Sequence, residues 1–224
     1  FTGAGISAES GISTFRDSNG LWENHDVMEV ASPEGWAKNP ELVLRFYNER
    51  RKQLSTVQPN SGHTALVKLE EKFDTWIVTQ NVDDLHERAG SKNILHLHGE
   101  LKKARSSKDP KQIYPMSKDE ILLGEKAEDG SQLRPHIVWF GEDVPMLEYG
   151  AALATLADIF IIVGSSLVVY PANMLVHYVP DHCKIFVIDP NYPEISSKLK
   201  FEFIQEPATT GIPRLVERLL AEEA

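Results

Sequence analysis

Cysteine is almost absent from this sequence: the chain of 224 residues contains one, Cys183. A single cysteine excludes an internal disulfide framework and any metal site built from several cysteines, and it fits a reducing compartment. No apolar stretch approaches the length of a membrane span, and the first residues lack the basic start and long apolar segment of a signal peptide. We therefore expect a soluble, cytoplasmic protein that does not bind membranes.

Positive charge is also scarce. The chain has 23 Lys and Arg against 33 Asp and Glu, which gives a formal net charge of −10. This balance argues against a general nucleic-acid-binding protein. It suits a partner that carries positive charge, such as a lysine-containing peptide.

A glycine-rich turn stands at the start of the chain. Residues 3–8 have the pattern Gly-x-Gly-x-x-Ala, whose glycines permit a tight turn and a close approach of the backbone to a phosphate group. Such a turn normally follows a strand, and only Phe1 and Thr2 precede it here. We expect the sequence to begin inside that first strand.

Short β-branched or aromatic runs alternate with helical segments from residue 74 onward. The predicted strands occupy residues 76–79, 94–98, 136–140, 158–164, 184–189 and 201–204, and the predicted helices occupy 39–54, 61–73, 146–157, 171–178 and 212–221. Strands of this kind, separated by helices, indicate an α/β fold: a doubly wound, parallel, Rossmann-like sheet covered on both faces.

One segment, residues 100–135, is polar throughout and contains a single apolar cluster at 121–123. We expect a small, solvated, inserted lobe with one short helix. The Rossmann-like domain then comprises residues 1–15, 74–99 and 136–224, and residues 16–73 form a loop and a helical module.

The stretch from Thr79 to Gly99 lies at the predicted active site. Alternation in residues 94–98 places His96 and His98 on the same face of a strand, and the strand ends at Gly99. Ligands of open α/β sheets bind beyond the carboxyl ends of the strands. His98 is therefore the better placed of the two for chemistry, while His96 lies deeper in the sheet and His86, on a following helix, is expected to be structural.

Several motifs together resemble those of sirtuins, the NAD-dependent protein lysine deacylases. They are GAGISAESGISTFRD, TQNVDDLHERAG, HLHGE, RPHIVWFGE, GSSLVVYPA and EPATTGIPRL, in the family's order and approximate spacing. The resemblance implies NAD as the cofactor and acylated lysine in proteins or peptides as the substrate. It implies NAD contacts by Gly3, Ala4, Gly5, Ser7, Phe15, Arg16, Gln80, Asn81, Asp83, Gly164, Ser165, Ser166, Asp189 and Ala208, with Asp189 in a position where the family commonly has asparagine.

The resemblance also assigns catalytic roles to His98, Asn81 and Asp83. In sirtuins the substrate acyl oxygen attacks the anomeric carbon of NAD as nicotinamide leaves, so the cofactor carries the difficult step. A base must then deprotonate a ribose hydroxyl, and histidine, with an ordinary pKa of about 6.5, suits that role at neutral pH. The implied products are free lysine, nicotinamide and an O-acyl-ADP-ribose.

Two segments match those between which sirtuins bind the substrate peptide as an added strand. The implied contacts are Val138, Phe140, Gly141 and Glu142 in one segment, and Val168, Val169 and Tyr170 in the other. Backbone pairing of this kind tolerates many sequences, so specificity falls on the acyl pocket.

Tyr47 and Arg50, three residues apart on one predicted helix, resemble the pair in sirtuins that remove succinyl, malonyl and glutaryl groups. A guanidinium binds a carboxylate through paired donors, and a phenol adds a third donor. The alternative is that Tyr47 packs in the core and Arg50 lies at the surface.

The chain departs from most sirtuins in residues 100–135, where the family carries four cysteines on a structural zinc ion. No cysteine occurs there, and His136 alone does not replace such a site. We predict no zinc and a lobe held by packing or by a shortened loop. Two other activities stay open: an NAD glycohydrolase or mono-ADP-ribosyltransferase, and a non-catalytic module that binds NAD or ADP-ribose.

Overall fold

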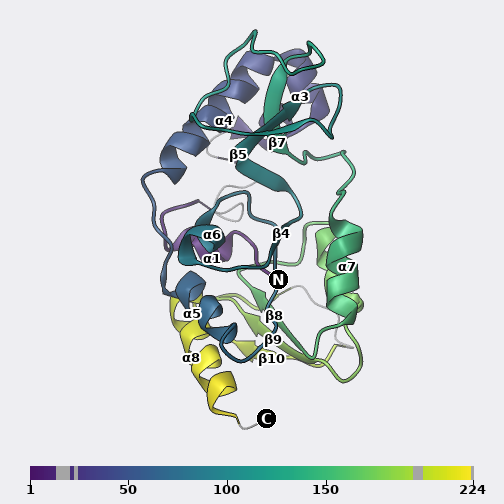
Figure 1. Ribbon diagram of the computed structural model, residues 1–224. Helices are drawn as coiled ribbons and strands as arrows, with labels where there is room; N and C mark the ends of the chain where they lie inside the picture. The colour runs from purple at the N-terminus through teal and green to yellow at the C-terminus, as the bar shows by residue number, and fades with distance from the viewer. Residues whose placement is uncertain (14–20, 23–24, 194–198, 223–224) are drawn as a thin grey trace.

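The structure is a computed structural model, and it describes residues 1–13, 21–22, 25–193 and 199–222 (Figure 1). Figure 1 shows a larger part with β8, β9 and β10 between helices, and a smaller part above it with β5, β7, α3 and α4. No helix in these described ranges is long and apolar enough to cross a membrane.

The larger part is built on a parallel sheet. Its strands are β3 (Ile77–Thr79), β4 (Ile94–His96), β8 (Ile159–Val163), β9 (Lys184–Ile188) and β10 (Glu202–Ile204). β3 pairs with β4, and β8 pairs with β9, which pairs with β10, all in parallel register. The doubly wound α/β class predicted from the sequence is confirmed.

Phe1 and Thr2 join the two halves of this sheet. Thr2 forms parallel bridges with both Thr79 of β3 and Val163 of β8. The Thr2 amide donates to the Val78 carbonyl, and the Val163 amide donates to the Phe1 carbonyl, each at 2.9 Å. The first two residues thus occupy the central strand position, which places the glycine turn that follows them at the middle of the sheet edge.

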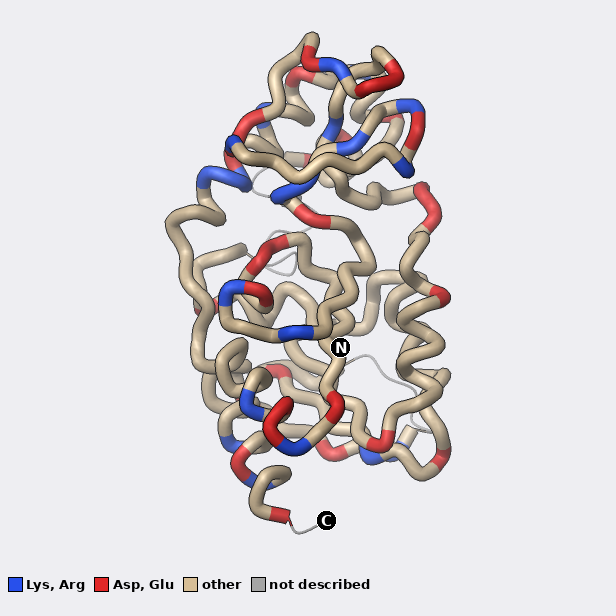
Figure 2. The backbone as a smooth tube through the Cα atoms, viewed as in Figure 1, with Lys and Arg blue, Asp and Glu red and all other residues tan. Residues whose placement is uncertain are grey.

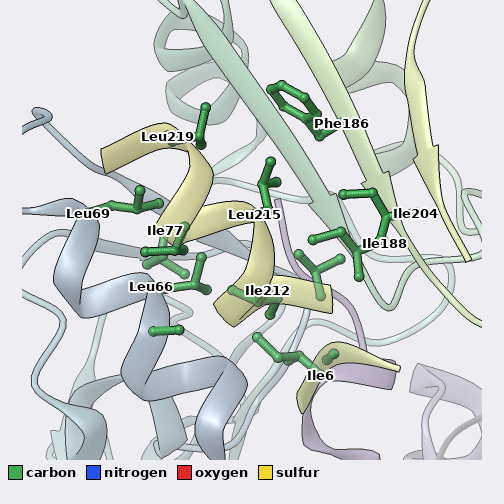
Figure 3. Close-up of a cluster of buried hydrophobic side chains, with 14 residues drawn as sticks. Ile6, Leu66, Leu69, Ile77, Phe186, Ile188, Ile204, Ile212, Leu215 and Leu219 are labelled. Carbon is green, nitrogen blue, oxygen red and sulfur yellow. The ribbon is translucent and has the colours of Figure 1, made fainter. Parts of the chain in front are cut away.

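Helices cover both faces of the parallel sheet, as the apolar character of its strands requires. On one face, α8 (Ala208–Ala221) and α5 (Ser61–Leu69) pack on β9 and β10, and Figure 3 shows Ile212 and Leu215 of α8 directed at Ile188 and Leu66. On the other face lie α7 (Leu147–Thr155) and η2 (Ala172–His177), packed around buried Leu175. η2 is a 3₁₀ helix, whereas the sequence predicts an ordinary helix there.

The smaller part contains a second sheet that the sequence does not predict. β5 (Gly99–Ser106) pairs antiparallel with β6 (Ile113–Pro115) and β7 (Leu133–Ile137). The strand predicted at residues 136–140 therefore starts earlier, ends at Ile137 and belongs to this sheet, so its assignment to the parallel sheet is wrong. The short helix expected in the inserted lobe is also wrong, because residues 100–135 contain no helix. In the apolar cluster at 121–123, Ile121 is buried against Leu44 and Ala104, while Leu122 and Leu123 are exposed.

Helices α3 (Pro33–Lys38) and α4 (Pro40–Leu54) pack beside this sheet. α4 starts as predicted, because the Asn39 side chain accepts from the Leu42 amide and Pro40 occupies the first helical position. The remaining short elements are α1 (Gly5–Ala8), β1 (Leu21–Trp22), β2 (His25–Asp26), α2 (Val27–Val30) and α6 (Leu85–Ala89). The last four residues predicted for the second helix, 70–73, lie beyond the end of α5.

Ser106 ties together the loops at the far end of the small sheet. Its hydroxyl donates to Asp129 at 2.6 Å, contacts the Ser131 hydroxyl at 2.8 Å and accepts from the Lys108 and Asp109 amides. Ser106 is buried. Charged residues of both signs follow one another along the surface loops of this lobe (Figure 2). The Ser106 network and the small apolar cluster around Ile121 hold the lobe together.

Candidate active site

A cavity of about 520 Å³ lies where the carboxyl ends of the parallel strands face the small lobe. This volume is typical of ligand pockets. Most residues that the sequence assigns to a site line it: Gly3, Ala4, Gly5, Ser7, Tyr47, Arg50, Gln80, Asn81, Asp83, His98, Val138, Phe140, Gly141, Glu142, Gly164, Ser165, Ser166, Val169, Tyr170, Asp189 and Ala208. Val168 is not among the lining residues and is exposed, and Phe15 and Arg16 lie outside the described residues.

Two glycine turns meet at one side of the cavity. Gly164 has a φ of +58°, and a Cβ atom there would lie 2.4 Å from the Ile6 nitrogen and 2.6 Å from Gly5. A Cβ on Gly3 would in turn lie 2.7 Å from the Gly164 carbonyl oxygen. The two turns therefore require glycine in order to touch each other, and they present a wall of backbone without side chains, which fits the close approach of a dinucleotide.

Gln80 links the strand-end segment to the second turn. Its side-chain amide donates to the Ser165 hydroxyl at 3.0 Å, and that hydroxyl also accepts from the Leu167 amide. Leu167 has a φ of +57°, which is unusual for a residue with a side chain. The bond from Ser165 helps to fix this turn beside the cavity.

Ser7 connects the first turn to Asn81 and Asp83. The Ser7 hydroxyl donates to an Asp83 carboxylate oxygen at 3.0 Å and accepts from the Asn81 side-chain amide at 3.3 Å. Burial raises the pKa of Asp83, against the lowering effect of its bonds from the Leu85 amide and Ser7. These three predicted residues thus form one network on the cavity wall.

His98 is held in one tautomer. Its Nδ1 lies 3.1 Å from the Gln80 carbonyl oxygen, which can only accept, so Nδ1 carries the proton. Burial lowers the pKa of His98, and the Gln80 bond offsets this in part. Nε2 has no hydrogen-bond partner among the described residues. The imidazole is neutral at neutral pH, with Nε2 able to accept a proton.

β4 ends at His96, so His98 follows the strand and does not belong to it. Its carbonyl accepts from the Val138 amide at 2.9 Å. Residues 138–142, where the sequence predicts peptide contacts, therefore start directly beside His98.

Tyr47 and Arg50 reach the cavity from α4. Tyr47 is fully buried, and its hydroxyl accepts from the Trp139 indole at 3.0 Å. Burial raises the pKa of Tyr47, so the phenol stays neutral. Arg50 stacks over the Phe46 ring, and its Nε and Nη1 atoms are buried with no hydrogen-bond partner among the described residues. Tyr47 thus packs in the core and lines the cavity at the same time.

The Glu142 carboxylate points into the small lobe. It accepts from Arg134 at 2.7 and 3.2 Å, from Arg105 at 3.1 and 3.0 Å, and from the Trp139 amide at 2.8 Å. Arg134 also stacks on the Trp139 ring, 3.2 Å from its centre. The sequence does not predict this cluster. Arg134 and Glu142 lie at the two ends of the motif RPHIVWFGE, but Arg105 lies in a polar segment without a motif, and nothing in the sequence shows that the three side chains meet.

Asp189 and Ala208 also line the cavity. Asp189 is buried, and its carboxylate accepts from the Asn191 amide at 2.8 Å. Ala208 is the first residue of α8. Their predicted contact with the adenosine half of NAD stays a prediction.

One group of potential metal ligands occurs among the described residues: Glu87, His96 and Glu100, whose ligand atoms lie within 4.8 Å of one another. It is not in the loops where the resemblance to sirtuins would place zinc. Glu87 and His96 already bond directly to each other at 2.6 Å.

The chain is similar to known protein sequences along most of its length. The Sir2 family model matches residues 3–171. A Bacteroides thetaiotaomicron protein named NAD-dependent protein deacylase is 50% identical over 225 residues, which cover 98% of this chain and 96% of the relative. A Helicobacter pylori protein of the same name is 53% identical over 219 residues, which cover 98% and 95%.

Solved structures agree as well. A Sir2 homolog–NAD complex has a TM-score of 0.88 at 37% identity and covers 98% of this chain and 87% of its own. A Sir2–p53 peptide–NAD+ complex has a TM-score of 0.78 at 30% identity and covers 99% and 92%.

Proposed function

The chain belongs to the Sir2 family, and from that premise we propose that it is an NAD-dependent protein lysine deacylase. The observation that supports this best is His98, which has a fixed tautomer and an Nε2 that no described residue engages, at a cavity walled by two glycine turns. The relatives named NAD-dependent protein deacylase match over nearly the whole chain. The expected substrates are proteins or peptides with an acylated lysine.

The protein's residues have distinct tasks in this proposal. Bound NAD supplies an anomeric carbon with nicotinamide as its leaving group. The Gly3 and Gly164 turns hold the cofactor's phosphates and ribose, while Asn81 and Asp83, fixed through Ser7, orient its nicotinamide half. His98 Nε2 takes the proton from a ribose hydroxyl, and the Gln80 carbonyl stabilises the resulting imidazolium through Nδ1.

We further propose that the enzyme prefers short acyl groups that end in a carboxylate, such as succinyl and malonyl. Arg50 supports this, because two N–H groups of its buried guanidinium have no acceptor in the described part of the chain, and such groups at a cavity wall strongly favour an anionic acceptor. The Tyr47 hydroxyl accepts from Trp139, and a phenol that accepts one bond can donate another. Together they would bind one carboxylate from two sides.

A panel of peptides tests both levels of this proposal. Acetyl-, succinyl- and malonyl-lysine peptides of the same sequence are incubated with NAD, and nicotinamide and O-acyl-ADP-ribose are followed by mass spectrometry. Arg50→Met is expected to lower kcat/KM for the succinyl peptide about 100-fold, since a charge-assisted pair contributes roughly 1.5–3 kcal/mol, and to leave the acetyl peptide within a few-fold. Arg45→Met, on the same helix but outside the cavity lining, is the matched control.

The outcomes separate the two claims. If no acyl peptide is turned over, the deacylase proposal fails. If acetyl is removed as fast as succinyl and Arg50→Met changes neither rate, only the acyl preference fails.

The two other activities make different predictions. An NAD glycohydrolase or mono-ADP-ribosyltransferase releases nicotinamide without an acyl peptide, or leaves ADP-ribose on protein. A non-catalytic module binds NAD but is as inactive as its His98→Ala variant.

A further inference from the structure

We propose that His96 is a positioning residue: as an imidazolium paired with Glu87, it fixes the main chain of Asn81 in the site. This inference rests on the proposed function for its activity readout but on geometry for its protonation state. The family resemblance assigns His96 no role.

The two histidines at the end of β4 bind successive carbonyls of the same segment. His98 Nδ1 lies 3.1 Å from the Gln80 carbonyl oxygen, and His96 Nδ1 lies 3.0 Å from the Asn81 carbonyl oxygen. The histidines differ at Nε2. That of His98 faces the cavity without a partner among the described residues, whereas that of His96 lies 2.6 Å from Glu87 Oε1.

Hydrogen-bond chemistry determines the charge of His96. A carbonyl oxygen only accepts, so Nδ1 must carry a proton. An ionised carboxylate also only accepts, so Nε2 must carry one too. The single alternative is a protonated Glu87, but its bond and charge contact with His96 outweigh burial and lower the pKa of Glu87 below the ordinary value. Both ring nitrogens are therefore protonated, and the short 2.6 Å contact is that of a charge-assisted bond.

The surroundings favour this charge. Three carboxylates face His96: Glu87 from α6, Glu100 from β5 and Asp83 from the segment before α6. The cationic neighbour is Lys103, which bonds to Glu100 at 2.5 Å. His86 on α6 is buried, and its pKa is lowered well below the ordinary value. Burial by itself would lower the pKa of His96, but Glu87, the Asn81 carbonyl and Glu100 raise it. His96, the last residue of β4, is thus charged, and His98, two residues beyond the strand, is neutral.

The His96 bond completes the restraint of Asn81. The Asn81 amide donates to the Thr79 hydroxyl at 3.0 Å, and the Asn81 side chain donates to Ser7. The carbonyl is held by His96 alone among the described residues. Because His96 is itself held by Glu87, loss of either member frees the peptide plane that orients the Asn81 side chain.

The first experiment measures protonation directly. Ring ¹⁵N shifts of labelled protein at pH 7 are expected to show His96 protonated at both nitrogens and His98 neutral with the proton on Nδ1. Glu87→Gln, a substitution at an exposed position, is expected to shift the His96 titration to lower pH, because the carboxylate of Glu87 raises the pKa of His96. A neutral His96 at pH 7 in the parent protein overturns the proposal, whether or not the protein is a deacylase.

The second experiment measures the consequence for activity. In the parent, kcat/KM for NAD is expected to fall at alkaline pH, where the neutral His96 ring can keep its one proton on Nε2 beside Glu87 and leave the Asn81 carbonyl without a donor. In Glu87→Gln this fall should begin at lower pH, because the carboxylate of Glu87 raises the pKa of His96. Asp158→Asn, at the exposed His182–Asp158 pair with its 3.1 Å contact, is the matched control and should leave the profile unchanged.

Substitutions of His96 separate positioning from folding. Asn places a neutral donor near the position of Nδ1, so His96→Asn should retain kcat/KM for NAD within about fivefold and lose the alkaline dependence. His96→Leu has no donor and should lower kcat/KM for NAD about 100-fold. Equal losses in both variants, or an unchanged profile in Glu87→Gln, contradict the proposal. A metal-dependent result also contradicts the proposal: a chelator removes the activity of the parent, and Zn²⁺ restores it in the parent but not in Glu87→Gln. The His96–Glu87 pair would then be a metal site.

Discussion

At the scale of single residues, the contact between the two glycine turns allows a sharp comparison. Gly164→Ala adds a methyl group 2.4 Å from the Ile6 nitrogen at a φ of +58°. We expect a loss of about 3 kcal/mol or more in unfolding free energy, from the left-handed backbone and from the displaced turn. Urea unfolding measures the loss, and isothermal titration with NAD should show weakened binding.

Gly124 provides the control, because it also has a positive φ, +95°, but nothing lies within 4 Å of a Cβ there. Gly124→Ala should cost only the backbone strain, about 1–2 kcal/mol, and leave NAD binding intact. Equal costs at the two positions would show that the turns can separate without penalty, contrary to the packing argument.

Residue patterns and the resemblance to sirtuins together predicted part of this site. Glycine in a turn at a strand end and histidine at the end of an alternating run are patterns that local sequence displays directly, and Gly3, Gly164 and His98 all line the cavity. Bonds between distant polar residues leave no such pattern. The pairing of His96 with Glu87 and the five bonds to Glu142 depend on which segments meet, and neither is visible in the sequence.

At the scale of secondary structure elements, Glu142 joins two strands of the small sheet. Glu142 lies in the segment after β7, and its carboxylate binds Arg105 of β5 and Arg134 of β7. Glu142→Gln is expected to cost about 3 kcal/mol in unfolding free energy, because it leaves two largely buried guanidinium groups without their anion. Glu202→Gln, in the exposed Glu202–Arg218 pair, should cost less than about 1 kcal/mol.

The same cluster predicts a pH dependence. Burial favours the protonated carboxyl of Glu142, but the bonds and charges of Arg134 and Arg105 hold its pKa below the ordinary value. Its stabilising contribution is therefore present above the unfolded-state pKa of about 4.3 and is lost as pH falls through the lower folded-state pKa. The difference in stability between parent and Glu142→Gln should shrink below pH 4; a constant difference down to pH 2.5 would contradict this.

Strand positions were easier to predict than strand partners. The run at residues 136–140 has the β-branched and aromatic character of a buried strand, and β7 does include its first two residues. Composition does not say which sheet a strand joins, and β7 pairs antiparallel with β5. The polar β5 and β6 were missed because a sheet that packs mainly through α4 needs few apolar residues of its own.

At the scale of the whole molecule, the cavity draws its walls from both parts of the fold, with His98 between them. The proposed cofactor residues lie mainly at the parallel sheet, and the proposed acyl and peptide residues lie mainly at α4 and residues 138–142.

We expect NAD alone to slow amide hydrogen exchange in the two glycine turns, and NAD with a succinyl-lysine peptide analogue to extend this protection to α4 and β7. Each ligand at 100 times its Kd should add about 2.7 kcal/mol of stability. β6, which contributes no residue to the cavity lining, is the internal control. Protection that stays within the parallel sheet when both ligands are present would mean that the peptide does not engage the small lobe, and the acyl pocket would then have to be sought elsewhere than at Tyr47 and Arg50.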